Sequence, residues 1–197
     1  EQVAEEVLPL DSSPWRMSVL CGINCQDDAE LILEFNGRNL GATIDTVEVK
    51  AGRVEEILAA ASVFPKSLRV FVEIPGDKDP AKLIQTLADV GLRAKVRTGG
   101  VTADAFPACD ALARFIGACV NARVQFKATA GLHHPIGATF NLTYKPDSER
   151  GAMYGFLNVF LAAAFVAKGL SVAEARQILH EESINMFRFD NDGVTWS

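Results

Sequence analysis

The chain has no run rich in Lys and Arg, and its formal net charge is −6 over 197 residues. A nucleic-acid backbone would meet repulsion rather than the counterion release that drives binding, so nucleic acid is not an expected partner. No signal peptide is expected from the opening residues either, because residues 1–6 are acidic and show no basic region followed by an apolar core. These absences predict a cytoplasmic protein.

Long hydrophobic runs and cysteines are both scarce. The longest uncharged stretch, residues 151–167, is shorter than the roughly 20 residues that span a bilayer, and it contains Tyr154 and Asn158. We therefore expect a buried core helix there and no membrane association. The four cysteines include no pair with zinc-site spacing, which indicates reduced thiols.

The composition is that of an ordinary globular protein, with 49% hydrophobic and 22% charged residues, and we expect a single domain over residues 1–197. Short runs rich in Val, Ile and Phe alternate with segments of helical periodicity, a pattern typical of repeated βα units on a parallel sheet. The strand candidates are residues 16–22, 42–50, 68–74, 93–98 and 124–130. The pattern predicts an α/β fold, a parallel (βα) barrel of TIM type.

The pattern changes after the fifth strand candidate. Residues 132–150 read as a long loop, residues 151–183 as a helical segment, and Met186–Phe189 as a sixth strand. Six strands are two short of a closed eight-stranded barrel. We therefore expect that two strands precede Glu1 in the complete protein, or that a partner chain, such as a second copy, covers the open edge. An open doubly wound sheet is the alternative, but no GxGxxG turn follows the first strand.

Polar residues gather at the carboxyl ends of these strands, where parallel βα folds assemble their active sites. Alternation along the fourth strand directs Ala94 and Val96 to the helices, so that Lys95 and Arg97 face inward. By the same alternation, Lys127 and Thr129 are predicted to face inward on the fifth strand. Other residues with polar side chains or turn geometry at these ends are Glu48, Lys50, Glu73, Thr98, Gly99, Gly100, His133 and His134.

Two inward lysines on neighbouring strands require an explanation, because a buried cation costs several kcal/mol unless it is paired or neutralised. One interpretation is structural: each lysine forms an ion pair with Glu48 or Glu73. The other is chemical, since burial beside a second cation lowers the pKa of a lysine and makes it a nucleophile. Arg97 and the RTGG turn would offer positive charge and backbone amides to an anionic substrate.

Four segments, IDTVEVKAG, LRVFVEI, KVRTGG and FKATAGL, resemble in order and spacing successive strands of the class I deoxyribose-phosphate aldolase family. The resemblance covers residues 45–132. It implies that Lys95 is the Schiff-base lysine, that Lys127 helps to depress its pKa, and that Asp45 and Glu73 take part in proton transfer. The whole chain also resembles a bacterial family without an assigned function, whose recurring sequence motifs are RTGG and GLHHP.

These observations together predict an aldolase-like lyase that acts on a small anionic carbonyl or sugar-like substrate through an imine at Lys95. Glu73 and His133 are the proton-transfer candidates, alongside the Asp45 of the resemblance. The predicted substrate-binding residues are Arg97, Thr98, Gly99, Gly100, Thr129, Glu48, Lys50 and His134. Strict alternation, however, places Asp45 out of phase with Glu48 and Lys50, so that they cannot share one face of the strand.

Two other functions are compatible with the same residues. His133 and His134 with Glu48 or Glu73 would suit zinc, manganese or iron in a metal-dependent barrel enzyme, whereas the leading hypothesis needs no cofactor. A barrel domain whose polar mouth binds a small anion without catalysis needs neither a metal nor a reactive lysine. The segment Ser148–Gly151 lacks the spacing and the lysine of a P-loop, so a nucleoside triphosphate is not indicated.

Overall fold

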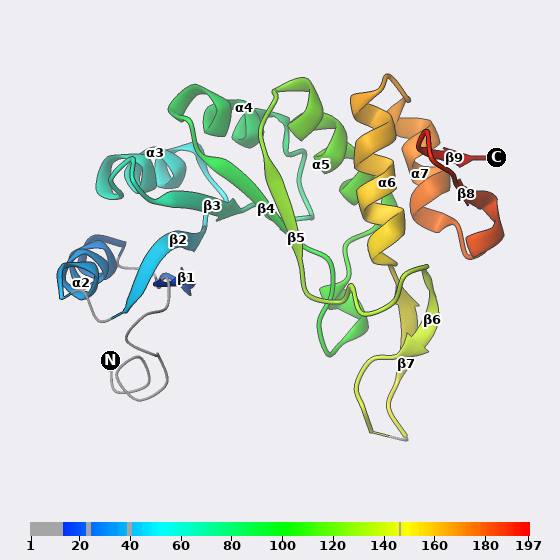
Figure 1. Cartoon of the computed structure of the whole chain (residues 1–197), viewed down its shortest axis with the longest axis horizontal. Coiled ribbons are helices and arrows are strands. Elements are labelled where there is room, and N and C mark those ends of the chain that lie inside the picture. Colours follow the sequence, from blue (N-terminus) through cyan, green and yellow to red (C-terminus); the bar gives the residue numbers. More distant parts are fainter. Residues whose placement is uncertain (1–13, 23–24, 39–40, 146) are drawn as a thin grey trace.

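The computed structural model describes residues 14–22, 25–38, 41–145 and 147–197. Its strands and helices alternate along most of the chain (Figure 1). The strands are β1 (Trp15–Leu20), β2 (Ala42–Lys50), β3 (Arg69–Glu73), β4 (Arg93–Arg97), β5 (Phe126–Thr129), β6 (Ala138–Asn141), β7 (Arg150–Met153), β8 (Phe187–Phe189) and β9 (Val194–Trp196). The helices are α2 (Cys25–Gly37), α3 (Val54–Val63), α4 (Ala81–Val90), α5 (Cys109–Asn121), α6 (Phe156–Ala167) and α7 (Val172–His180), with 3₁₀ turns η1 (Ala103–Ala105) and η2 (Ile184–Met186).

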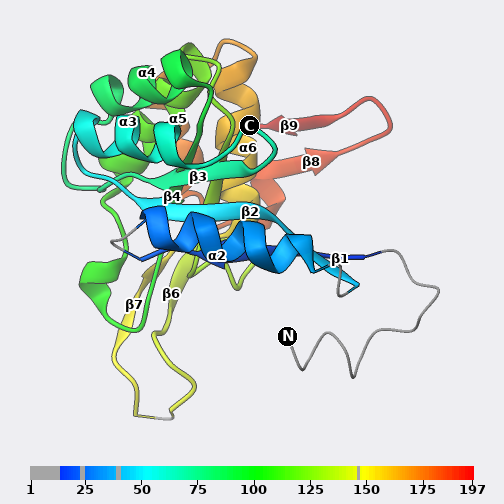
Figure 2. The ribbon, with the colours of Figure 1, turned by 90° about the vertical axis from the view of Figure 1, so that its left-hand side faces the viewer.

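The main sheet contains five parallel strands in the order β1-β2-β3-β4-β5. Figure 1 shows the sheet curled into an arch, with α3, α4 and α5 on its convex side. Figure 2, turned by 90°, shows α2 lying along β1 and β2. The five strand candidates of the sequence are therefore confirmed, and the fold is a mixed α/β half-barrel.

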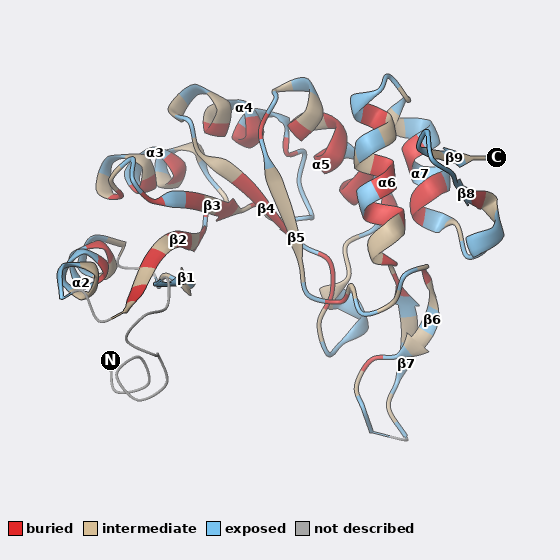
Figure 3. Cartoon of the chain, viewed as in Figure 1, coloured by how far each residue is buried: buried red, intermediate tan, exposed pale blue. Residues whose placement is uncertain are grey.

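Side-chain alternation separates the two faces of the sheet. Val47, Val49, Val70, Val72 and Val96 point to the helices and are almost completely buried. They belong to one hydrophobic cluster with Ile57, Ile84, Leu112 and Ile116 of the helices. Figure 3 shows the buried segments concentrated on the central strands and on the helix faces that cover them. The remaining residues of each strand face the concave side, and most of them are polar.

The helix boundaries follow local signals. Asp79 accepts a hydrogen bond from the Ala81 backbone at 3.0 Å, and α4 ends at Gly91 with φ of 73°, a left-handed conformation that favours glycine. Helix α7 begins with a capping box in which Ser171 and Glu174 satisfy each other's backbone amides. Within the described residues, no helix is both long and apolar enough to cross a membrane.

The prediction that residues Met186–Phe189 form a sixth strand of the barrel was wrong. The segment at Phe187–Phe189 is a strand, but it pairs antiparallel with β9 in a separate two-stranded sheet. The cause is the turn between them, where Asp190 accepts hydrogen bonds from the backbones of Asp192 and Gly193 and closes a hairpin. Residues 132–150 likewise hold β6 and the first residue of β7, a hairpin that Figure 1 shows projecting from the body of the molecule.

Candidate functional site

Lys95 lies at the centre of a row of charged side chains on the concave face. Register places Lys50 of β2, Glu73 of β3, Lys95 of β4 and Lys127 of β5 side by side. The Lys95 Nζ is 2.7 Å from Glu73 Oε2 and 2.7 Å from Glu48 Oε2. Lys95 is only 6% exposed, so both carboxylates are held against a cation that water barely reaches.

The row extends beyond Lys95 on both sides. Lys127 forms an ion pair with Glu48 Oε1, and its Nζ lies 4.4 Å from the centre of the Phe71 ring. Lys50 Nζ lies 3.6 Å from Glu73 Oε1. Three ammonium groups thus alternate with two carboxylates, and the ion pairs of the structural interpretation are all formed.

This arrangement fixes the resting charge of the row. Burial lowers the pKa of Lys95, but hydrogen bonds to Glu48 and Glu73 and their negative charges outweigh burial and raise it above the ordinary lysine value. Burial raises the pKa of Glu48, while the hydrogen bonds from Lys127 and Lys95 reverse that effect and lower it. Lys95 is therefore an ammonium ion at neutral pH and becomes nucleophilic only after a proton leaves it.

Asp45 lies on the same face, although strict alternation placed it on the other one. Met17 pairs with Ile44 and Ser18 with Thr46, so Asp45 is an extra residue in β2. Such a bulge shifts the phase of alternation, which explains why that expectation was wrong. Asp45 accepts a hydrogen bond from Arg69 at 2.7 Å and is also paired with Arg16. It belongs to a cluster separate from Lys95, at the opposite end of the strands.

The turns after β4 and β5 are locked together. The Thr98 side chain donates to the Ala130 carbonyl at 2.7 Å, and the Thr98 backbone donates to the Thr129 carbonyl at 2.9 Å. A Cβ added at Gly99 would lie 2.5 Å from the Cα of Gly131. Gly131 has a φ of 73°, so neither glycine tolerates a side chain. Thr98, Gly99 and the carbonyl of Thr129 thus hold the two turns together.

Arg97 is positioned by this lock. It is exposed, and its Nε donates to the Gly99 carbonyl at 2.9 Å. Its guanidinium Nη2 lies 3.6 Å from the place where a Cβ on Gly100 would be, so the arginine lies beside the glycine turn, whereas the same Cβ would lie 2.5 Å from the Cβ of Ala105. The cation is thereby held at the carboxyl end of β4.

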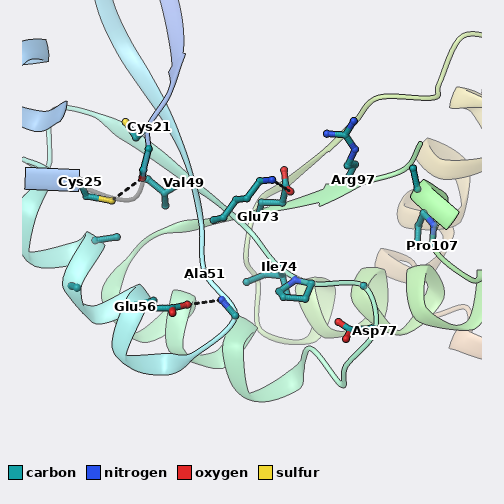
Figure 4. Close-up of a pocket in the computed structure, with 18 of the residues that line it drawn as sticks. Cys21, Cys25, Val49, Ala51, Glu56, Glu73, Ile74, Asp77, Arg97 and Pro107 are labelled. Atoms are coloured by element: carbon teal, nitrogen blue, oxygen red, sulfur yellow. Dashed lines mark hydrogen bonds and ion pairs between the residues drawn. The ribbon is translucent and has the colours of Figure 1, made fainter. Parts of the chain in front are cut away.

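A cavity of about 1210 Å³ opens at this edge of the sheet. Figure 4 shows Glu73 and Arg97 reaching it from neighbouring strands, with Asp77 on the loop after β3. Lys50, Glu73 and Arg97 are the predicted site residues that line it. Sequence reasoning missed the other polar or reactive lining residues, which are Cys21, Cys25, Gln26, Glu56, Asp77 and Asp104. Asp77 could have been found, because it follows the carboxyl end of β3.

The two adjacent histidines do not join the charged row. His134 stacks on Phe140 with ring centres 3.5 Å apart and an interplanar angle of 11°, and His133 is exposed. Within the described ranges, no group of three or more His, Cys, Asp or Glu side chains is close enough to hold a metal ion. His133 and His134 therefore lie at the base of the β6–β7 hairpin, and Glu48 and Glu73 have lysines as their partners.

No family model matches the chain, and searches of curated proteins and of solved structures also find no match.

Proposed function

We propose that this chain is a partial TIM-type barrel that acts as an aldolase-like lyase on a small anionic carbonyl or sugar-like substrate, through an imine at Lys95. The observation that carries the proposal is the position of Glu73. One of its carboxylate oxygens contacts Lys95, and its side chain also lines the large cavity at the carboxyl edge. Glu73 thus links a buried amine to the space in which a substrate would bind.

The resting ammonium defines the first step. A substrate carbonyl that enters past Glu73 would meet Lys95 Nζ, and its binding would displace water from the carboxylates. One ammonium proton would pass to Glu73, and the freed amine would attack the carbonyl carbon. The carbinolamine would lose its hydroxyl as water, with the proton returned by Glu73. The resulting iminium would accept the electron pair of the bond between its α and β carbons as that bond breaks, while the β-hydroxyl loses its proton to Glu73 and the β carbon leaves as an aldehyde or ketone. Glu73 would then return that proton to the α carbon of the enamine, and hydrolysis of the imine by water would release the second carbonyl product and restore the Lys95 ammonium.

The anionic end of the substrate would lie against Arg97 and Lys50, since both line the cavity and each keeps hydrogen-bond donors for a ligand. Arg97 is the stronger candidate, because its partner in the structure is the neutral Gly99 carbonyl. A guanidinium held by a rigid turn suits two-point recognition of a carboxylate or phosphate.

The proposal is tested by intact mass after incubation with a panel of small aldehydes and ketones plus borohydride. We expect a mass increment that peptide mapping places on Lys95. It should vanish in Lys95→Arg, which keeps the cation but cannot form the imine, and persist in Lys82→Arg on the exposed face of α4. An increment on another lysine, or none across the panel on folded protein, would overturn it.

The raised pKa of Lys95 favours a second candidate, a domain that binds a small anion without catalysis. This alternative needs only the cations that line the cavity, and it leaves the ion pairs of Lys95 undisturbed. The same panel separates the two functions, because a binding domain would retain affinity for the anion while giving no borohydride-stable adduct.

A further inference from the structure

The concave face of the sheet carries a charge opposite to that of the chain. Alternation and register place seven cations on it: Arg16, Lys50, Arg69, Arg93, Lys95, Arg97 and Lys127. The carboxylates on the same face are Asp45, Glu48 and Glu73. The face therefore has an excess of four positive charges, whereas the whole chain carries −6. Such a surface concentrates anions.

The excess positive charge is not spread evenly over the concave face. Glu48 and Glu73 are shared by three lysines, and Asp45 is shared by Arg16 and Arg69, so each cluster retains one positive charge. The two other charges belong to Arg93 and Arg97. Within the described part of the chain, neither of these arginines forms a salt bridge, and the side-chain hydrogen bonds of both go to neutral oxygens, those of Gln125 and Gly99.

Arg93 and Arg97 lie at opposite ends of β4 and on the same face as Lys95. At roughly 3.3 Å per residue, their Cα atoms are about 13 Å apart, and Lys95 is midway between them. The Arg93 guanidinium lies 5.8 Å from the centre of the Phe71 ring, which also contacts Lys127. Phe71 thus makes a cation–π contact with each of these two cations, one on β4 and one on β5.

We infer that Arg93 and Lys127, held by Phe71, form a second oxyanion subsite, and that the substrate is elongated, with an acidic group at each end and the reacting carbonyl between them. This inference rests on the proposed function, because it assigns one end to Arg97 and the middle to Lys95. Carboxylate and phosphate share the chemistry that the subsite requires, namely several oxygen acceptors on one charged group.

The probes are methylphosphonate, linear α,ω-bisphosphonates of increasing chain length, and the matching α,ω-dicarboxylates, titrated calorimetrically into the full chain. Affinity should rise with length and peak where both ends are bound. Arg93→Gln and Arg97→Gln should each weaken the best bisphosphonate about tenfold, and each should remove one of two methylphosphonate sites. Arg114→Gln, at an exposed position of α5, is the charge-matched control and should change neither. Comparison of the two series decides between phosphate and carboxylate.

The inference is overturned if affinity is independent of length, or if Arg93→Gln and Arg114→Gln have equal effects. Thermal melting of each variant checks that loss of binding is not loss of folding. The probes contain no carbonyl, so their binding is independent of imine formation. An adduct at Lys95 without length dependence would overturn this inference alone, and length dependence without an adduct would overturn the proposed chemistry alone.

Discussion

Among the residues that the structure describes, Lys95 is the one charged residue that is buried, and its ion pairs connect the charged side chains of the concave face. Its ammonium pairs with both Glu48 and Glu73, which are themselves largely covered. The net stability that such a buried cluster contributes is small, because desolvation offsets the attraction. Removing one member is costly, however, since its partners remain buried and charged.

Lys95→Met should therefore lower the free energy of unfolding by about 3 kcal/mol at neutral pH. The deficit should shrink as the pH falls below 4.5, the ordinary value from which the pKa of Glu48 is lowered, since protonation relieves the unpaired Glu48 carboxylate of the variant while in wild type it breaks the ion pairs of Glu48. Urea denaturation across this range measures both effects. Lys82→Met, at an exposed position, should change stability little at any pH.

Asp45 affects how the free energy of unfolding depends on pH in the acid range. Burial raises the pKa of Asp45, but hydrogen bonds from Thr46, Arg69 and Arg16 outweigh it and lower the pKa from 3.8 to about 2. A lowered folded-state pKa contributes stability above pH 3.8 that is lost as the pH falls toward 2.

Asp45→Asn should accordingly cost about 1 kcal/mol at pH 7, a modest value because Arg16 and Arg69 are both solvent-exposed. Between pH 4 and 2, the stability of the variant should fall less steeply than that of wild type. Chemical denaturation at a series of pH values provides the test. Parallel curves for the two proteins would show that Asp45 does not titrate as the structure implies.

At the scale of elements, the two turns after β4 and β5 act as one unit. Gly99 and Gly131 approach so closely that their backbones are in contact, and Thr98 bonds across the gap. This contact fixes the direction of Arg97. The sequence motif RTGG indicates on its own an ordinary turn, and its function as half of an interlocked pair depends on a partner turn 32 residues away.

Gly131→Ala should lower the free energy of unfolding by about 3 kcal/mol, because its φ is 73° and the added Cβ would lie 2.7 Å from Thr98 O. Gly91→Ala is the matched control: its φ is also 73°, but nothing lies within 4 Å of its Cβ. It should cost about 1 kcal/mol. Thermal or urea denaturation compares them, and equal losses would show that backbone strain alone, without a clash, accounts for the effect.

The boundaries of elements show which signals the sequence carries. Apolar residues at alternate positions marked all five strands of the sheet, because a buried face needs them there. The bulge at Asp45 was not predicted, since an extra residue changes the phase of side-chain alternation without changing the composition of the strand. The β8–β9 hairpin also escaped it, although Asp192 and Gly193 between two short apolar runs are a known turn signal.

At the scale of the molecule, the described chain is an arch with an apolar convex side under helices and a charged concave side (Figure 1). In a closed barrel the inner face is filled mainly by branched apolar residues. Here the inner face carries an ion-pair row and two arginines, Arg93 and Arg97, that have no carboxylate partner among the residues the structure describes. This composition supports the proposed binding of an anionic ligand, because excess positive charge attracts anions.

The sequence by itself determined the five parallel strands, the direction of Lys95, Arg97 and Lys127, and the edge at which polar residues meet, because alternation and strand order depend on local patterns. Only the tertiary structure decided which charges pair, because pairing depends on register between strands. It also turned Asp45 onto the concave face, enclosed Cys21, Cys25 and Asp77 in the cavity, and kept His134 with Phe140. Those outcomes rest on distances between segments far apart in the chain.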